Sequence, residues 1–213
     1  MAEGSIEIRD LHRNEVSDAI GVLARGMRDN PLHVAAYGED PQRRLRCHAR
    51  LISGFFRMSD AQQPIAAVED GTLVGVTGVA PPGTCQPTAL QRLRILPTML
   101  GLGPRTAARV GDWYSRWAER DPDEPHVHLG PLAVDAHLQG RGIGSRIMEE
   151  HCRRLDSAGE LGYLETDKPE NVRFYERFGY ELVGEDDVIG VRNWFMNRPP
   201  PNSGTPPRSR GAR

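Results

Sequence analysis

Lysine is almost absent from this 213-residue chain, because 26 of its 27 basic residues are arginines and Lys168 alone is a lysine. A phosphate-binding loop of the ATP type must end in Gly-Lys-Ser/Thr. Lys168 stands between Asp167 and Pro169, so this class of nucleotide site is excluded. The formal net charge of −2 gives no general attraction to nucleic acid or to a membrane surface, and we expect neither as a partner.

Cysteine is also scarce. The three cysteines, Cys47, Cys85 and Cys152, are odd in number and lack the spacing of metal ligands. They predict neither a disulfide framework nor a zinc site. We therefore expect no metal and a reducing, cytoplasmic location.

Long apolar runs are missing. A membrane span needs about 18 consecutive apolar residues, and no run approaches that length. The first residues also lack the basic and apolar segments of a secretion signal. The length suits one well-buried domain, which we expect over residues 1–198. Residues 199–213 are rich in proline, glycine, serine and arginine with almost no apolar side chains, so we expect a disordered tail.

The spacing of apolar residues predicts an α/β domain. Alternation indicates a first strand at 5–11, and Asp70-Gly71 marks a hairpin between two β-branched runs. Helices are expected at 12–27 and 41–58, joined by a polar linker that contains Asn30-Pro31. The other expected elements are strands at 65–69, 73–79, 126–134, 162–166, 180–183 and 191–197, and helices from near 145 to 158 and from 171 to 178.

Residues 87–125 are expected to form a helical insertion. Its first helical stripe consists of Leu90, Leu93 and Leu96. We expect Pro97 to end that stripe, because proline breaks a helix interior. Trp113 and Trp117 share one face of a second helix, where core packing is favoured over ligand contact. An apolar insertion broken by proline and glycine indicates a substrate wall or lid.

A glycine-rich turn at 139–144 lies between the strand 126–134 and an amphipathic run. The first N–H groups of a helix are unpaired and carry partial positive charge, and glycines let a phosphate approach the backbone. The turn therefore predicts a pyrophosphate site. A dinucleotide fingerprint would need a third glycine, but Ser145 or Ile147 stands at its place, so we set that interpretation aside.

Two segments resemble the GNAT superfamily of N-acetyltransferases. Gln139, Gly142 and Gly144 match its acetyl-CoA turn, Gln/Arg-x-x-Gly-x-Gly/Ala. A distal segment with Glu165-Thr166, Asn171 and residues 174–180 resembles its second motif, and is most similar to puromycin N-acetyltransferase-like members. The resemblance covers residues 127–197. It implies a mixed, mostly antiparallel central sheet flanked by helices, a splayed strand pair at the CoA site, and acetyl-CoA as cosubstrate.

Gly130-Pro131 interrupts the strand before the turn, and this pair predicts a bulge or a splay. The resemblance implies that the pantetheine arm fills the opening and that Asn171 contacts the pantetheine or the adenylate. It also implies CoA contacts from Leu132, Ala133 and Val134, and from the turn residues Gln139, Gly140, Arg141, Gly142, Ile143, Gly144 and Ser145. Arg141 either adds a charged phosphate contact or is merely solvated.

Four residues are candidates for proton transfer. The resemblance places Tyr175 near the CoA sulfur as general acid, and a phenol with a pKa of about 10 holds its proton at neutral pH. His128 is the first choice of base, with His126 on the same strand face as a relay or a replacement. Glu165 is the alternative base or an anchor for a cationic substrate. If it has no functional role, we expect a buried carboxylate paired with an arginine.

The function expected from these motifs is acetyl-CoA-dependent N-acetylation of a primary amine on a small molecule, by direct attack through a tetrahedral intermediate. Two alternatives stay open at this point. One is a protein or peptide N-acetyltransferase, and the other is a non-catalytic module that binds acetyl-CoA. A homodimer is also left open, and the acceptor amine is not identified.

Overall fold

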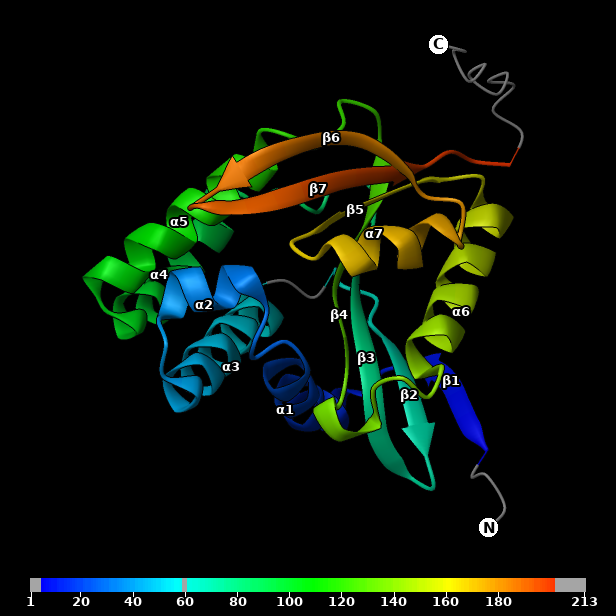
Figure 1. Cartoon of the computed structure of the whole chain (residues 1–213), viewed down its shortest axis with the longest axis horizontal. Coiled ribbons are helices and arrows are strands. Elements are labelled where there is room, and N and C mark those ends of the chain that lie inside the picture. The colour runs from blue at the N-terminus through cyan, green and yellow to red at the C-terminus, as the bar shows by residue number, and fades with distance from the viewer. Residues whose placement is uncertain (1–4, 59–60, 202–213) are drawn as a thin grey trace.

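A computed structural model describes residues 5–58 and 61–201 (Figure 1). Seven strands form one sheet in the order β1-β2-β3-β4-β5-β7-β6, and only the β4–β5 pair is parallel. The expected mixed, mostly antiparallel sheet is confirmed. The strands are β1 (Ile6–Asp10), β2 (Ile65–Glu69), β3 (Thr72–Ala80), β4 (His126–Val134), β5 (Leu161–Thr166), β6 (Glu181–Val188) and β7 (Val191–Arg198).

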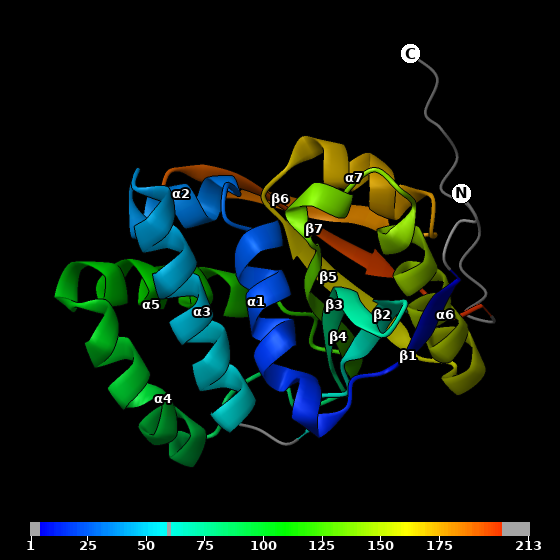
Figure 2. The same ribbon diagram turned by 90° about the horizontal axis from the view of Figure 1, so that it is seen from below.

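Helices cover both faces of the sheet (Figure 2). They are α1 (Val16–Gly26), α2 (Pro31–Tyr37), α3 (Pro41–Met58), α4 (Ala89–Leu102), α5 (Pro104–Ala118), α6 (Ile143–Ala158) and α7 (Pro169–Glu176), with short 3-10 turns at Arg13–Glu15 and Ala136–Leu138. Strand β2 contributes side chains to the cores on both faces of the sheet, because successive side chains of a strand point to opposite sides. Ile65 and Ala67 pack in one core with α6, whereas Ala66 and Val68 pack in another with α1.

The predicted hairpin and bulge are both present. Asp70 and Gly71 have φ angles of 49° and 76°, as the tight turn between β2 and β3 requires. The pairing of β3 with β4 shifts in register between Thr77 and Val79, opposite Gly130-Pro131. Gly78 is needed there, since a Cβ at this position would lie 2.4 Å from the carbonyl oxygen of Gly130.

Strands β4 and β5 part midway along their length. Their paired residues run from His126 with Leu161 to His128 with Tyr163, but β4 continues to Val134 and β5 to Thr166. The other edge of β5 stays paired with β7 as far as Thr166. The expected splay is therefore confirmed, and it opens β4 beyond His128 on the side that faces β5.

Two predictions that rested on prolines are wrong. The segment after Asn30 is helix α2 instead of a linker, because Pro31 occupies the first helical position, where its missing N–H costs nothing. Pro97 lies inside α4 instead of ending it. The leucine stripe of α4 points outward, with Leu93 66% exposed. Of the expected disordered tail, residues 202–213 lie outside the described residues.

Candidate active site

A cavity of about 460 Å³ lies where β4 and β5 part. The splayed strands contribute His128 and Leu132 from β4 and Glu165 and Thr166 from β5. The 87–125 insertion supplies the facing wall through Ile95, Met99, Trp113, Tyr114 and Trp117. Trp117 Nε1 donates to Asn193 Oδ1 at 3.1 Å, which attaches α5 to β7. The tryptophans thus combine core packing with cavity lining, two roles that the sequence interpretation treated as alternatives.

His128 and Glu165 form an ion pair at the inner end of the splay. The His128 Nε2 to Glu165 Oε2 distance is 2.8 Å, and the Glu165 side chain is 2% exposed. Burial lowers the pKa of His128, but Glu165, Cys85 and Asp121 outweigh burial and raise it to about 10. This pKa lies well above the value of about 6.5 assumed from the sequence.

Unpaired polar atoms gather around this cavity. Among the described residues, five buried side-chain atoms have no hydrogen-bond partner, and all five belong to residues that line it. They are His48 Nε2, Trp113 Nε1, Asp121 Oδ1, His128 Nδ1 and Glu165 Oε1. Buried polar groups are normally paired, because leaving one unsatisfied costs about 1–3 kcal/mol. The cavity is thus suited to a polar ligand.

Tyr175 reaches the cavity from α7. Its side chain is buried, and it packs against the rings of Phe174 and Tyr180. Burial, followed by the nearby charges of Asp167 and Glu165, raises the pKa of Tyr175 well above its ordinary value. The phenol therefore retains its proton, as a general acid requires.

The glycine turn leads from β4 into α6. Gly140 and Gly142 have φ angles of 82° and 79°, and Gly142 caps the helix. Gln139 donates through Nε2 to the carbonyl oxygens of Gly26 at 3.2 Å and Val134 at 3.1 Å. Its amide holds the turn against the ends of α1 and β4, a positioning role that the motif alone did not reveal.

Two other predicted cofactor residues have partners within the protein. Arg141 forms a bidentate ion pair with Glu69 of β2, with N–O distances of 2.7 and 3.1 Å. Its guanidinium is therefore held beside the turn, and a phosphate would share it with a carboxylate. Asn171 donates to Thr166 Oγ1 at 3.1 Å and lines the cavity. Leu132, Ala133 and Val134 all lie on the part of β4 that has left β5.

Sequence reasoning missed the cavity residues that come from the insertion and its ends, among them Cys85, Asp121 and Tyr114. Their one local signal is that Cys85 and Asp121 flank the two helices. Nothing in their spacing shows that these ends return to the same point of β4. Among the described segments, no helix is both long enough and apolar enough to cross a membrane.

The fold agrees with a known protein family. The model of the acetyltransferase (GNAT) family matches residues 30–180, and the chain belongs to this family. The closer similarity to puromycin N-acetyltransferase-like members stays a prediction.

A curated relative, the "probable spermine N(1)-acetyltransferase" of Bacillus subtilis subsp. natto, is 28% identical over 85 residues. The match spans 37% of this chain and 56% of that relative, so the chain covers only about half of the relative's length.

Solved structures share the fold. A protein of Corynebacterium glutamicum, described as histone acetyltransferase HPA2 and related acetyltransferase, has a TM-score of 0.65 at 17% identity, covering 95% of this chain and 99% of that one. The polyamine N-acetyltransferase of Drosophila melanogaster has a TM-score of 0.58 at 17% identity, covering 92% and 100%. A GNAT acetyltransferase of Brucella melitensis in complex with acetyl-CoA has a TM-score of 0.52 at 16% identity, covering 92% and 88%.

Proposed function

We propose that this enzyme transfers the acetyl group of acetyl-CoA to a primary amine of a small, cationic molecule. The observation that carries the proposal is Glu165, a carboxylate with a 2% exposed side chain whose Oε1 lies unpaired at the cavity. A carboxylate placed in this way selects an ammonium group, because the charge of the ligand offsets the cost of burial. The polyamine acetyltransferases among the similar proteins support the same acceptor class.

The splay would receive the pantetheine arm of acetyl-CoA. Leu132, Ala133 and Val134 lie on the part of β4 beyond its pairing with β5, and those of their backbone groups that do not bond to β3 would pair with the pantetheine amides. The pyrophosphate would lie on the N–H groups of the turn, at residues 140–145 and the start of α6, where the helix dipole favours an anion. Asn171 would contact the pantetheine from α7.

Acetyl transfer then follows from the positions around the cavity. Glu165 Oε1 accepts one proton from the substrate ammonium, and the freed amine attacks the thioester carbon to form a C–N bond. A backbone N–H of β4 stabilises the oxyanion of the tetrahedral intermediate. The C–S bond breaks as Tyr175 protonates the leaving thiolate. The second amine proton restores the phenol, so the net reaction yields the amide, the thiol of CoA and one proton.

The choice of Glu165 over His128 as the proton acceptor rests on which atom is available. His128 Nε2 is already engaged with Glu165 Oε2, whereas Glu165 Oε1 has no partner among the described residues. His128 then acts by orienting the carboxylate. We retain His128 as the alternative base, and the two assignments differ in which substitution removes turnover.

Acetylation of a protein or peptide is the second candidate. A peptide acceptor requires an open groove, and here residues of α4 and α5 line one side of the cavity. This arrangement favours a small acceptor. A non-catalytic module that binds acetyl-CoA would need neither a buried phenol nor an unpaired carboxylate.

Thiol release from acetyl-CoA, measured with a panel of amines, tests the proposal. We expect diamines and polyamines to accelerate release more than neutral amines of the same length, with the acetylated product confirmed by mass spectrometry. Peptides with free N-termini or lysines provide the comparison for the second candidate. If acetyl-CoA binds but no amine in the panel accelerates release, the proposed function is wrong.

A further inference from the structure

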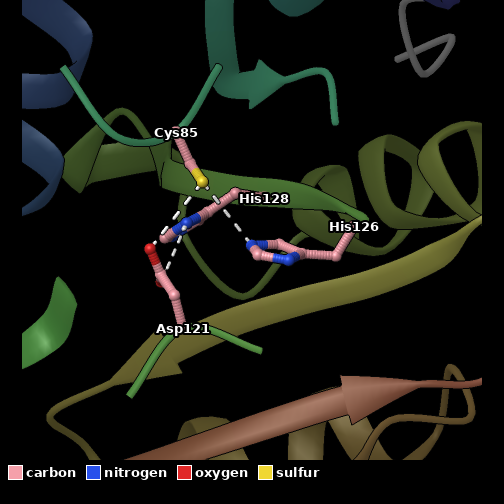
Figure 3. Close-up of side chains that lie close together, drawn as sticks. All are labelled: Cys85, Asp121, His126 and His128. Carbon is pink, nitrogen blue, oxygen red and sulfur yellow. Dashed lines mark hydrogen bonds and ion pairs between the residues drawn. The ribbon is translucent and has the colours of Figure 1, made fainter. Parts of the chain in front are cut away.

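Four side chains meet at the point where the insertion joins β4 (Figure 3). Cys85 precedes α4, Asp121 follows α5, and His126 and His128 lie on β4. Cys85 Sγ lies 3.6 Å from His126 Nε2 and 3.7 Å from Asp121 Oδ2, while His128 Nδ1 lies 3.8 Å from Asp121 Oδ1. One ligand atom from each residue lies within 4.8 Å of all the others.

These separations suit a single tetrahedral metal ion. Zinc bonds of about 2.3 Å to sulfur and about 2.0 Å to nitrogen or oxygen imply about 3.5 Å from sulfur to the other ligand atoms, and about 3.3 Å among those atoms. The separations of Cys85 Sγ from His126 Nε2 and of His128 Nδ1 from Asp121 Oδ1 exceed these values by about 0.5 Å or less, and all the ligand atoms lie within 4.8 Å of one another. Small side-chain shifts would close the shell around an ion.

Both histidines are oriented by groups behind them. The Nδ1 atom of His126 lies 2.9 Å from the carbonyl oxygen of Glu124, and His128 Nε2 lies 2.8 Å from the Glu165 carboxylate. The second nitrogen of each ring, Nε2 of His126 and Nδ1 of His128, faces the cluster. Metal-binding histidines have this arrangement, because an acceptor on the remote N–H sets the tautomer and makes the ligand nitrogen more basic.

Two of the atoms that face the cluster have no hydrogen-bond partner among the described residues, and a metal ion would give them a partner. His128 Nδ1 and Asp121 Oδ1 are buried without a hydrogen-bond partner. Asp121 Oδ2 accepts a hydrogen bond from Gln86, so Oδ1 is the oxygen left for a ligand.

We propose that Cys85, Asp121, His126 and His128 bind one Zn²⁺ ion. A thiolate, two imidazoles and a carboxylate suit zinc, whereas Mg²⁺ and Ca²⁺ prefer oxygen ligands throughout. Four protein ligands fill a tetrahedron, so the ion is structural. It joins the two ends of the insertion to β4 and so fixes the wall of the cavity.

The ion also defines the role of His128. With zinc on Nδ1, the Nε2–H donates to Glu165 Oε2, and His128 has no nitrogen left to accept a substrate proton. This consequence bears on the proposed function, but the metal site does not depend on it, because the ligands, their distances and the groups behind them involve neither acetyl-CoA nor the amine.

Metal binding to the full chain tests the proposal. The protein is stripped with a chelator and titrated with Co²⁺, and then with Zn²⁺. We expect one equivalent of Co²⁺ to produce the strong visible absorption of a tetrahedral site together with a thiolate charge-transfer band, and Zn²⁺ to abolish both. Zn²⁺ should also raise the melting temperature of the stripped protein.

Variants assign the ligands. Cys85→Ser should abolish the charge-transfer band, whereas Cys152→Ala, which removes a cysteine on α6, should leave it unchanged. If Cys85→Ser does not fold, Asp121→Asn provides a second measurement, with weaker Co²⁺ binding and a retained band. Glu165→Gln should lower Zn²⁺ affinity by about 10–100-fold through His128. Binding below one equivalent, a spectrum without the band, or wild-type affinity in Cys85→Ser and His126→Gln would overturn the site.

Discussion

The Nε2 atom of His128 on β4 lies 2.8 Å from Oε2 of Glu165 on β5, at the point where the pairing of these two strands ends. A side-chain ion pair thus takes over where backbone pairing ends. It holds one oxygen of the carboxylate and leaves the other at the cavity. The same contact links the proposed acceptor site to the proposed metal site, so substitution of Glu165 should affect both, and amine kinetics and Co²⁺ binding measure the two effects separately.

Glu165→Gln tests the carboxylate as proton acceptor. The amide keeps the size of the side chain but cannot take a proton from the ammonium, so kcat/KM for amines should fall by about 10²–10⁴-fold. Steady-state kinetics over a range of amine concentrations measures the loss. Glu170→Gln, at an exposed position on α7, is the matched control and should retain wild-type activity. A larger loss in His128→Gln than in Glu165→Gln would instead assign the base to His128.

Tyr175→Phe tests the general acid. Removing the hydroxyl leaves the ring packed against Phe174 and Tyr180, so acetyl-CoA affinity should be retained. The thiolate would leave without a proton, and we expect kcat to fall by about 10²-fold or more. Calorimetric binding of CoA and turnover rates are measured on the same preparation. Unchanged kcat in this variant would exclude Tyr175 as the acid.

Gly142→Leu tests the phosphate assignment of the turn. Gly142 has a φ angle of 79° and Gly190, in the turn between β6 and β7, has one of 85°, and a Cβ added at either position would meet no atom within 4 Å. Leucine at either position should cost about 1–2 kcal/mol of stability through left-handed strain. Gly142→Leu alone should abolish CoA binding. Equal CoA affinity in the two variants would contradict the assignment.

Acid stability should depend on His151. Burial, then the charges of Arg198 and Arg154, lower the pKa of His151 to about 4, and its Nε2 lies 2.9 Å from the Tyr180 hydroxyl. The unfolded chain takes up this proton near pH 6.5, whereas the folded protein does so only near pH 4. Stability from this group is therefore present above about pH 6.5 and decreases towards pH 4, by roughly 3 kcal/mol.

Urea unfolding between pH 7 and pH 4 measures this dependence. His151→Gln has no titrating group at that position, so it should lose less stability over the same interval than the wild-type protein. His33 and His48 are also buried with lowered pKa values, and they contribute equally to both proteins. The difference between the two curves thus reports His151, and parallel curves would contradict the prediction.

Local chemistry explains which elements the sequence predicted. Asp70-Gly71 specifies a tight turn, and Gly130-Pro131 prevents regular pairing, because each dipeptide restricts its own backbone. Errors arose where context overrides such rules. Pro31 begins a helix because a first-turn proline loses no hydrogen bond, and α4 continues through Pro97.

The chain order alone predicted the family, the glycine turn at Gln139, Gly142 and Gly144, and the strand that opens beside it, because these features depend on residues close together in sequence. Only the tertiary structure decided what surrounds the cavity. It pairs His128 with Glu165, encloses the cavity with α4 and α5, and brings Cys85 and Asp121 to His126. Gln86 and Asp121, at the two ends of the insertion, are hydrogen-bonded although 35 residues of chain separate them. No pattern of residues close together in sequence predicts such a contact.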